Sequence, residues 1–289
     1  MKRGRNSREL YLPATMKDRE FQRFSAAIYD LVGIKMPPEK KLMLEGRLQK
    51  RLKALGIATF EAYGEFVFNP KGDDSELIRL IDVVTTNKTD FFREPAHFEL
   101  LIKRVLPELL RVGRDLRSDP LKIWSAGCST GEEPYTIAMV LSEFAHGHPG
   151  FAASVVASDV CTDVLKTAKM GIYPEDRTDA IPLNLKKKYL LKSRDKTNGL
   201  VRFSPKLRSL VRFCRINFMD DSFGLKEKMD IIFCRNVVIY FDTQTRQELM
   251  QKFYGQLRDG GFLFIGHSES LKDLDVDFEQ VALTVYQKL

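Results

Sequence analysis

The stretch that decides the fold of this chain is Ile123-Trp-Ser-Ala-Gly-Cys-Ser-Thr-Gly-Glu-Glu-Pro-Tyr135. An apolar run from Leu121 to Trp124 leads into a turn of small residues that ends at Gly131, and two acidic residues and Pro134 follow. Carboxylates suit the positive end of a helix dipole, and proline is tolerated in a first helical turn. The stretch therefore predicts a strand, a glycine loop and a helix, which is the first unit of a nucleotide-binding type of α/β fold.

The same loop indicates the chemical class of its ligand. Gly127 and Gly131 have no Cβ, so a ligand can approach the backbone closely. Glu132 and Glu133 would repel a diphosphate but attract an ammonium group, a sulfonium group or hydroxyls. We therefore expect S-adenosylmethionine rather than NAD, and the GxGxxG fingerprint of an NAD(P) dehydrogenase is absent. A glycine-rich turn that binds nothing is the alternative that this loop alone leaves open.

Two further apolar runs end in polar residues that suit a ligand site. The run 154–158 is followed by Asp159, whose carboxylate can bind the two ribose hydroxyls of an adenosyl group. The run 229–234 is followed by a polar tip that includes Asn236 and Tyr240. Because ligands of open α/β sheets bind at the carboxyl ends of the strands, we expect these side chains at the site.

Four segments in this order resemble the CheR-type chemotaxis receptor methyltransferases, which are protein-glutamate O-methyltransferases. They are Thr85-Thr-Asn-Lys-Thr-Asp-Phe-Phe-Arg93, Trp124-Ser-Ala-Gly-Cys-Ser-Thr-Gly-Glu-Glu-Pro-Tyr135, Cys234-Arg-Asn-Val-Val-Ile-Tyr-Phe-Asp242 and Gly260-Gly-Phe-Leu-Phe-Ile-Gly-His-Ser-Glu269. The resemblance extends from about residue 20 to the end of the chain. It implies an α/β fold: a Rossmann-like S-adenosylmethionine-dependent methyltransferase domain with an N-terminal helical domain and a small antiparallel β insertion.

The resemblance also implies the reaction and the residues that carry it. The enzyme would use S-adenosylmethionine to methylate glutamate carboxylates of chemoreceptor (methyl-accepting chemotaxis protein) cytoplasmic helices, giving methyl esters for sensory adaptation and S-adenosylhomocysteine as product. The catalytic residues would be Arg93 and Tyr240. The cofactor-binding residues would be Asn87, Thr89, Arg93, Glu133, Asp159, Asn217, Phe218, Asn236 and Val237, of which Asn217-Phe218 departs from the common Asn-Leu. No metal is expected, because the four histidines lack metal-ligand spacing.

Patterning along the chain predicts its organisation. We expect an N-terminal helical domain over residues 1–85, of which 1–17 form a frayed arm, and a connector over 86–95 that contributes to the cofactor site. The methyltransferase domain would follow over 96–289, with the β insertion at about 186–215. Within it, 189–203 predicts two strands around an Asn-Gly turn. The segment 210–216 is either a third strand of the insertion or the next strand of the main sheet, and 280–287 predicts one final strand.

Composition bounds the compartment and the partners. The 289 residues are 44% hydrophobic, yet no run approaches the ~18–20 apolar residues of a membrane span. The basic start of the chain lacks the apolar core of a secretory signal, and the four cysteines are scattered as reduced thiols would be. We therefore expect a cytoplasmic protein without membrane insertion, and the resemblance implies that it is peripheral to membrane-bound receptor arrays.

The net charge of +7 favours an acidic partner. A leucine stripe at Leu44, Leu48, Leu52 and Leu55 defines the buried face of one helix, and the basic residues beside it predict a docking face for the receptor. The proposed docking residues are Lys40, Lys41, Arg47, Lys50 and Arg51. The second basic segment is the β insertion, for which two interpretations stay open: a binding site for the receptor's C-terminal peptide, or a solvated hairpin without a ligand.

Two other functions are compatible with parts of the pattern. A nucleic-acid methyltransferase would suit the net charge, but the tip that begins at Arg235 lacks the proline pair of amino-methylating enzymes, so no nucleic acid is expected as a partner. An S-adenosylmethionine-binding docking or regulatory protein without catalysis would keep the pocket as a relic. Intact Arg93, Glu133, Asp159 and Asn236 argue against this second alternative.

Overall fold

The computed structural model describes residues 14–69, 71 and 74–289, and it divides into two compact units. The sheet unit comprises Leu31–Lys35 and Thr85–Leu289. The helical unit comprises the described residues up to 30 together with Met36–Val84. The five residues 31–35 thus belong to the sheet unit, although the residues directly before and after them in the chain belong to the helical unit.

The helical unit confirms the helical character expected for residues 18–84. Its elements are α1 (Asp18–Val32, whose last two residues belong to the sheet unit), a 3₁₀ turn (Pro38–Lys40), α2 (Lys41–Leu55), α3 (Phe60–Val67) and α4 (Asp74–Val84). Leu44, Leu48 and Leu52 are fully buried, so these three residues of the predicted stripe face the core of the unit, whereas burial was wrongly predicted for Leu55, which is exposed at the last position of α2. Gly56 ends α2 with a left-handed φ of +68°, which glycine adopts without a steric cost.

The prediction of a frayed arm over residues 1–17 fails at the C-terminal end of that range. Residues 1–13 lie outside the described part of the chain, but Met16 is buried and its N–H donates to Glu45 Oε2 at 2.8 Å. Apolar burial and this hydrogen bond hold the chain against α2 before α1 begins. The expected frayed arm is therefore wrong for Met16.

The basic face predicted for α2 is only partly exposed. Arg51 donates two hydrogen bonds to the buried carboxylate of Glu76, at 2.9 and 2.7 Å, and Tyr63 donates a third at 3.0 Å. A buried carboxylate needs such partners, so Arg51 serves the core of the unit. Lys50 is exposed as expected, whereas exposure was wrongly predicted for Arg51; Lys53, which was not part of the prediction, is also exposed.

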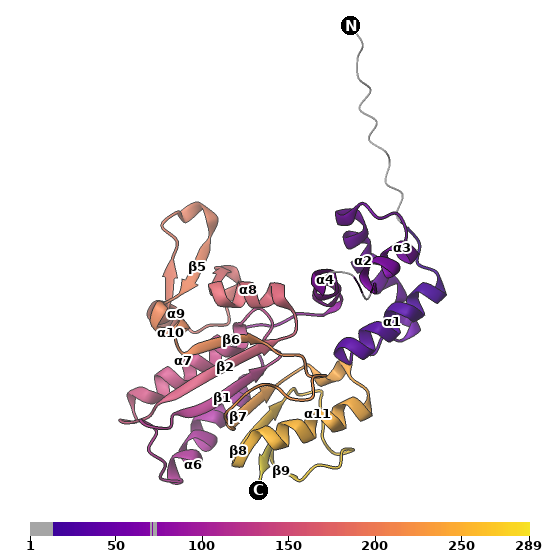
Figure 1. Cartoon of the computed structure of the whole chain (residues 1–289). Helices are drawn as coiled ribbons and strands as arrows, with labels where there is room; N and C mark the ends of the chain where they lie inside the picture. The colour runs from indigo at the N-terminus through magenta and orange to yellow at the C-terminus, as the bar shows by residue number, and fades with distance from the viewer. Residues whose placement is uncertain (1–13, 70, 72–73) are drawn as a thin grey trace. The chain divides into compact units, whose positions relative to one another are not determined.

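The sheet unit is built on seven strands in the order β6-β2-β1-β7-β8-β10-β9 (Figure 1). Their bounds are β1 Leu121–Ala126, β2 Ala153–Asp159, β6 Val211–Arg215, β7 Met229–Cys234, β8 Leu257–Ile265, β9 Phe278–Ala282 and β10 Val285–Lys288. The first five strands in this order pair in parallel, and β10 is antiparallel to both β8 and β9. This arrangement confirms the predicted Rossmann-like sheet.

Helices cover both faces of this sheet. They are α5 (Pro95–Leu100), a π-helical turn (Leu101–Val105), α6 (Leu106–Arg111), α7 (Glu132–His146), α8 (Thr162–Met170) and α11 (Thr243–Gln256). Ile231 and Phe233 of β7 belong to a core shared with α7, whereas Ile232 belongs to a core shared with α11. Burial on both faces explains why 229–234 is apolar at every position except Asp230.

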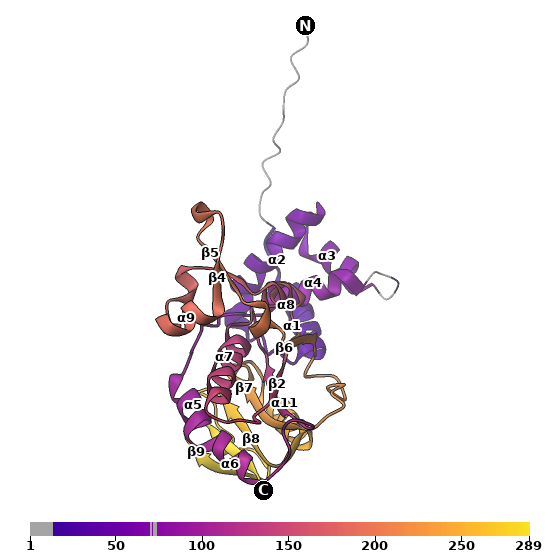
Figure 2. The ribbon, with the colours of Figure 1, turned by 90° about the vertical axis from the view of Figure 1, so that its left-hand side faces the viewer.

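A small antiparallel sheet, with strand order β3-β5-β4, confirms the predicted insertion but not its range (Figure 2). Its strands are β3 (Ile172–Pro174), β4 (Leu190–Lys192) and β5 (Leu200–Phe203), and the short helices with them are η3 (Asp176–Thr178), α9 (Leu183–Tyr189), η4 (Lys196–Asn198) and α10 (Pro205–Arg208). The hairpin expected over 189–203 is present. The range of about 186–215 differs at both ends, because β3 starts the small sheet and β6 pairs with β2 in the main sheet.

The single final strand expected over 280–287 is wrong. The chain instead forms a hairpin of β9 and β10 around Leu283 and Thr284. Thr284 has a left-handed φ of +55°, although left-handed turn positions usually hold glycine, asparagine or aspartate. The sequence therefore carries no conventional signal for this turn.

Candidate cofactor-binding and active site

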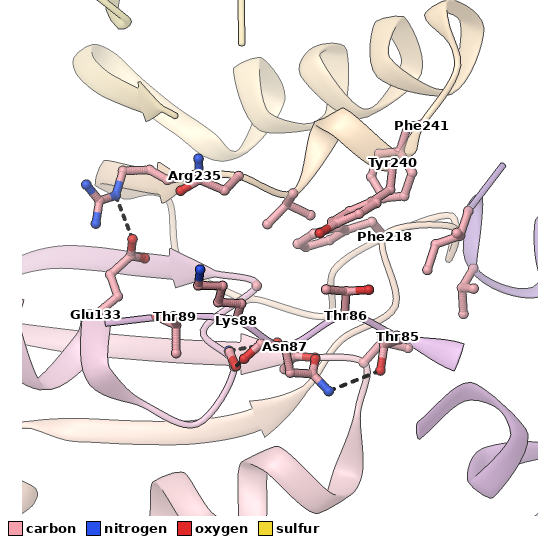
Figure 3. A pocket seen from close by; sticks show the side chains of 18 of the residues that line it. Thr85, Thr86, Asn87, Lys88, Thr89, Glu133, Phe218, Arg235, Tyr240 and Phe241 are labelled. Atoms are coloured by element: carbon pink, nitrogen blue, oxygen red, sulfur yellow. Dashed lines mark hydrogen bonds and ion pairs between the residues drawn. The ribbon is translucent and has the colours of Figure 1, made fainter. Parts of the chain in front are cut away.

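A pocket lies at the carboxyl ends of four parallel strands of the sheet unit (Figure 3). Gly127 and Ser129 follow β1, Asp159 ends β2, Asn217 and Phe218 follow β6, and the 235–237 tip follows β7. The chain runs outward from β1 in both directions across the sheet, to β2 and β6 on one side and to β7 and β8 on the other. Such a switch point is where open α/β sheets bind ligands.

All the residues predicted for the cofactor, and the predicted catalytic Tyr240, line this one pocket. They are Asn87, Thr89, Arg93, Glu133, Asp159, Asn217, Phe218, Asn236, Val237 and Tyr240. Figure 3 shows Thr85 and the connector residues Thr86 to Thr89 along one side, with Phe218, Tyr240 and Phe241 along the other. The structure therefore brings together segments that are separated by up to about half of the chain.

The loop after β1 is shaped by close backbone approach. Gly127 has a φ of +83°, and a Cβ there would lie 2.5 Å from Cγ2 of Val237. Ser129 is also left-handed, with a φ of +48°. Its N–H donates to Asp159 Oδ2 at 2.8 Å, while the N–H of Cys161 donates to Oδ1 at 2.9 Å. These two hydrogen bonds orient the Asp159 carboxylate, which also lines the pocket.

Glu133 is held in place by two hydrogen bonds inside the protein. Ser125 Oγ donates to Oε1 at 2.7 Å, and Arg235 Nε donates to Oε2 at 2.7 Å (Figure 3). Glu133 lines the pocket, so its charge is available to a cationic or hydroxylated ligand group. Glu132 is different: it is buried, accepts from Thr130 and Arg177, and is not part of the pocket lining. The ligand-facing role expected of the acidic pair thus falls on Glu133.

The connector residues reach the pocket through contacts with several other segments. Asn87 accepts at its carbonyl from Ser129 Oγ at 2.8 Å, and the Thr89 carbonyl accepts from Arg177 Nη2 at 2.8 Å. Arg93 makes one side-chain hydrogen bond within the described residues, from Nη1 to the Lys88 carbonyl at 3.3 Å. The remaining donors of Arg93 can therefore bind a carboxylate in the pocket.

Sequence reasoning missed a wall of the pocket that comes from residues 31–35. Val32 and Ile34 line it, and two hydrogen bonds hold this segment. Asn217 Nδ2 donates to the Leu31 carbonyl at 2.6 Å, and the Lys35 N–H donates to the Tyr240 carbonyl at 3.0 Å. The amide nitrogen of Asn217 is therefore engaged within the protein.

Arg235 is the other residue that was missed. It is buried, and besides Glu133 it donates from Nη1 to the Arg93 carbonyl at 2.7 Å and to Glu94 Oε2 at 3.3 Å. The signal that could have found it is an arginine directly after the apolar run Ile231–Cys234, because a charge there must be paired.

Glu94, His97 and His267 form the one metal-like cluster among the described residues. The Nδ1 atom of His97 accepts from Arg235 Nη1 at 3.2 Å, and Nε2 donates to Thr284 Oγ1 at 2.9 Å, since that hydroxyl itself donates to the Leu283 carbonyl. Burial, and next the charge of Arg235, lower the pKa of His97 to about 4. The lone pair a metal would need is occupied, and a guanidinium beside it opposes a cation.

The residues present fit an adenosyl ligand that carries positive charge. A carboxylate stands at the end of β2, a second carboxylate lines the pocket at Glu133, and the loop between them lacks side chains where the backbone must be approached. Phe218 and Phe241 supply aromatic surface. The fold and the site thus define an S-adenosylmethionine-dependent methyltransferase.

Comparison with known proteins gives the family. A family model described as "CheR methyltransferase, SAM binding domain" matches residues 87–287. A second, described as "CheR methyltransferase, all-alpha domain", matches residues 19–85. The chain belongs to the CheR methyltransferase family. It is 40% identical to a chemotaxis protein methyltransferase of Borreliella burgdorferi, covering 98% of this chain and 99% of that protein. It is 37% identical to chemotaxis protein methyltransferase 2 of Pseudomonas aeruginosa, covering 92% of each, and 36% identical to the Escherichia coli protein, covering 94% and 91%.

Substitution of Gly127 by alanine should weaken S-adenosylhomocysteine binding at least ~10-fold, because the new methyl group would push Val237 and the loop apart. Isothermal titration calorimetry measures this affinity. Gly260→Ala is the matched control, since Gly260 has a similar φ of +73° but open space around its Cβ position. It should lose about 1–2 kcal/mol of unfolding free energy and keep its affinity. Equal affinities of the two variants would contradict the role of close approach at Gly127.

Proposed function

We propose that this chain methylates glutamate side chains in the cytoplasmic helices of chemoreceptors, with S-adenosylmethionine as the methyl donor. The observation that carries the proposal is the convergence of all the predicted cofactor residues on one pocket, in a chain of the CheR family. The products would be a glutamate methyl ester and S-adenosylhomocysteine. Such a substrate places the reaction at the cytoplasmic side of membrane-bound receptor arrays, and no helix in the described ranges has the length and apolar character to span a membrane.

The chemistry asks little of acid–base groups. A bound S-adenosylmethionine supplies a methyl group on positively charged sulfur, and a carboxylate oxygen forms the new C–O bond as the C–S bond breaks. A glutamate with an ordinary pKa of about 4.3 is already ionised at neutral pH, so no general base is required. The residues of the pocket must instead align the carboxylate and keep water away from it. The apolar wall of Val32, Ile34 and Ile216 suits the second task.

Arg93 and Tyr240 are the residues we assign to alignment. Arg93 has unused donors at the pocket and can bind a carboxylate through two of them. A tight grip on the substrate would reduce its nucleophilicity, so we assign the cofactor's carboxylate to Arg93. Tyr240 lines the pocket on the side opposite Thr86 to Thr89, and its hydroxyl would orient the acceptor carboxylate (Figure 3).

Transfer of a labelled methyl group tests the proposed function directly. The protein is incubated with radiolabelled S-adenosylmethionine and membranes that contain chemoreceptors, and the product is treated with base. Release of the label as methanol identifies a carboxyl methyl ester. Binding of the cofactor without transfer would favour a non-catalytic regulatory protein, and transfer to nucleic acid instead would favour a nucleic-acid methyltransferase.

Arg93→Ala should lower the rate of methyl transfer by about 100-fold or more while the protein stays folded, because a charged group that positions a reactant is lost. The rate of Arg93→Lys should lie between those of the parent protein and Arg93→Ala, since lysine keeps the charge and loses the bidentate geometry. Cofactor affinity by calorimetry and turnover at saturating cofactor are measured separately. A normal rate for Arg93→Ala at saturation would exclude Arg93 from the chemistry.

We also propose that α2 docks on the receptor through its exposed basic residues. Lys50 and Lys53 are exposed, and Leu42 on the same helix is 78% exposed, so the face offers both charge and apolar surface. The other predicted docking residues are engaged within the helical unit: Lys41 pairs with Asp18, and Arg51 pairs with Glu76. Arg47 likewise donates to the Val84 carbonyl. Lys40 lies in the 3₁₀ turn before α2 and is half-buried, so the proposed surface is formed by Lys50 and Lys53.

The double substitution Lys50→Glu and Lys53→Glu should raise the KM for receptor several-fold with little change in kcat, because docking precedes the chemistry. The KM of the parent should also rise with salt, since exposed charges are screened over about 8–10 Å at 0.1–0.15 M. Lys226→Glu with Lys272→Glu is a control with the same change in net charge on exposed residues of the sheet unit. Equal KM values for the two double variants would contradict docking on α2.

The small sheet is the site we propose for the receptor's C-terminal peptide. Its order leaves β3 and β4 as edge strands, and Leu191 of β4 is 52% exposed. An extended peptide can add to such an edge through backbone hydrogen bonds. Basic residues around it, Lys192 and Arg194 among them, would meet acidic groups or the terminal carboxylate.

Replacement of residues 192–199 by a short Gly-Asn turn should lower methylation of intact receptors and spare an isolated substrate fragment. The reason is that tethering raises the effective concentration of substrate without changing the active site. Initial rates on receptors with and without their C-terminal tail measure the effect. Unchanged rates on complete receptors would favour a solvated hairpin without a ligand.

A further inference from the structure

The segment Gly266-His-Ser-Glu269 after β8 has no role in the site described so far, yet it contacts the tip of β7. Glu269 is buried, and its Oε2 accepts from the N–H of Asn236 at 2.9 Å and from that of Gly266 at 2.5 Å. A Cβ at Gly266 would lie 2.5 Å from Asn236 Nδ2. Asn236 itself is left-handed, with a φ of +60°. The segment thus holds the backbone of Asn236 in a conformation that L-residues rarely adopt.

The side chain of Asn236 is held by a second carboxylate, that of Glu94. Asn236 Nδ2 donates to Glu94 Oε1 at 3.3 Å, and the N–H of His267 donates to the same oxygen at 3.2 Å. The other oxygen, Oε2, accepts from Arg235 Nη1 at 3.3 Å. The Glu94 side chain is only 10% exposed and its own φ is +56°. Glu94 therefore joins the connector, the β7 tip and the segment after β8.

The partners of Glu94 fix its ionisation and its orientation. Burial by itself would raise the pKa of Glu94, but the hydrogen bond from the His267 N–H and the charge of Arg235 lower it. His97 is neutral and uses Nδ1 to accept from Arg235, so the guanidinium is fixed from that side too. Asn236, His267 and Arg235 each donate an N–H hydrogen bond to Glu94. The two oxygens of the Glu94 carboxylate accept all three hydrogen bonds.

We propose that Glu94 is a positioning residue for cofactor binding. By accepting from Nδ2 of Asn236 it fixes the orientation of that amide, so that Oδ1 is the atom left to accept from a donor of the bound cofactor, such as its ammonium group. The proposal rests on the cofactor site proposed above. It adds that recognition at Asn236 depends on a carboxylate that does not itself line the pocket.

Exchange of donor and acceptor between the two side chains tests this. Asn236→Asp places two carboxylates against each other and should weaken S-adenosylhomocysteine binding by more than about 10-fold. Glu94→Gln places an amide opposite Arg235 in place of the carboxylate, and should weaken S-adenosylhomocysteine binding by about 10-fold. In Asn236→Asp with Glu94→Gln, the introduced amide can donate to the introduced carboxylate. The double variant should therefore bind at least about 5-fold more tightly than Asn236→Asp alone.

Calorimetry with S-adenosylhomocysteine gives the affinities, and thermal unfolding of each variant separates a positioning effect from loss of fold. Glu99→Gln is the matched control: it makes the same chemical change on α5, at a side chain that is 66% exposed and pairs with Lys103. It should bind like the parent. Affinity equal to the parent in Glu94→Gln, or no rescue in the double variant, would overturn the positioning role. A parent that binds no S-adenosylhomocysteine would overturn the cofactor assignment itself.

Discussion

The buried guanidinium of Arg235 is the interaction on which the architecture of the pocket depends. Its side chain is 2% exposed, and it bonds to Glu133 at the start of α7 and to Glu94 at the end of the connector. A charge removed from water to this extent must be fully paired, because removal of one partner typically costs about 3–5 kcal/mol. The ion pairs therefore tie the β7 tip, the connector and the glycine loop's helix into one arrangement before any ligand arrives.

Backbone strain is concentrated in the same place. Among the described residues, five that are not glycine have a left-handed φ, and four of them lie at or beside the pocket: Phe92, Glu94, Ser129 and Asn236. Each such residue costs on the order of 1–3 kcal/mol, which the surrounding structure must supply. Carboxylates do this at two of them: Asp159 accepts from the N–H of Ser129, and Glu269 accepts from that of Asn236. A preorganised site is the result, because the donors and acceptors need no rearrangement to receive a ligand.

The parts of this structure that local signals determine could be predicted from the sequence. The unit from Leu121 to His146 was found because apolar strand, glycine turn and helix start are adjacent in the chain, and the shared motifs named residues that line one pocket. Features set by distant partners could not be found. The strand at 172–174 is too short to show periodicity, and the ion pair between Arg235 and Glu133 joins residues 102 positions apart. Whether the Arg51 side chain is exposed likewise depended on a buried carboxylate 25 positions away in the chain.

The segment 31–35 has a consequence for how this protein can be divided. It precedes most of the helical unit in the chain, yet Val32 and Ile34 line the pocket and Asn217 bonds to the Leu31 carbonyl. A fragment that begins at residue 85 would therefore lack one wall of its own binding site. The same holds for chimeras: exchange of the first 84 residues between relatives would transplant part of the pocket together with α2. The smallest portable methyltransferase module of this chain is thus discontinuous, and modular recombination at the apparent domain border would alter the site itself.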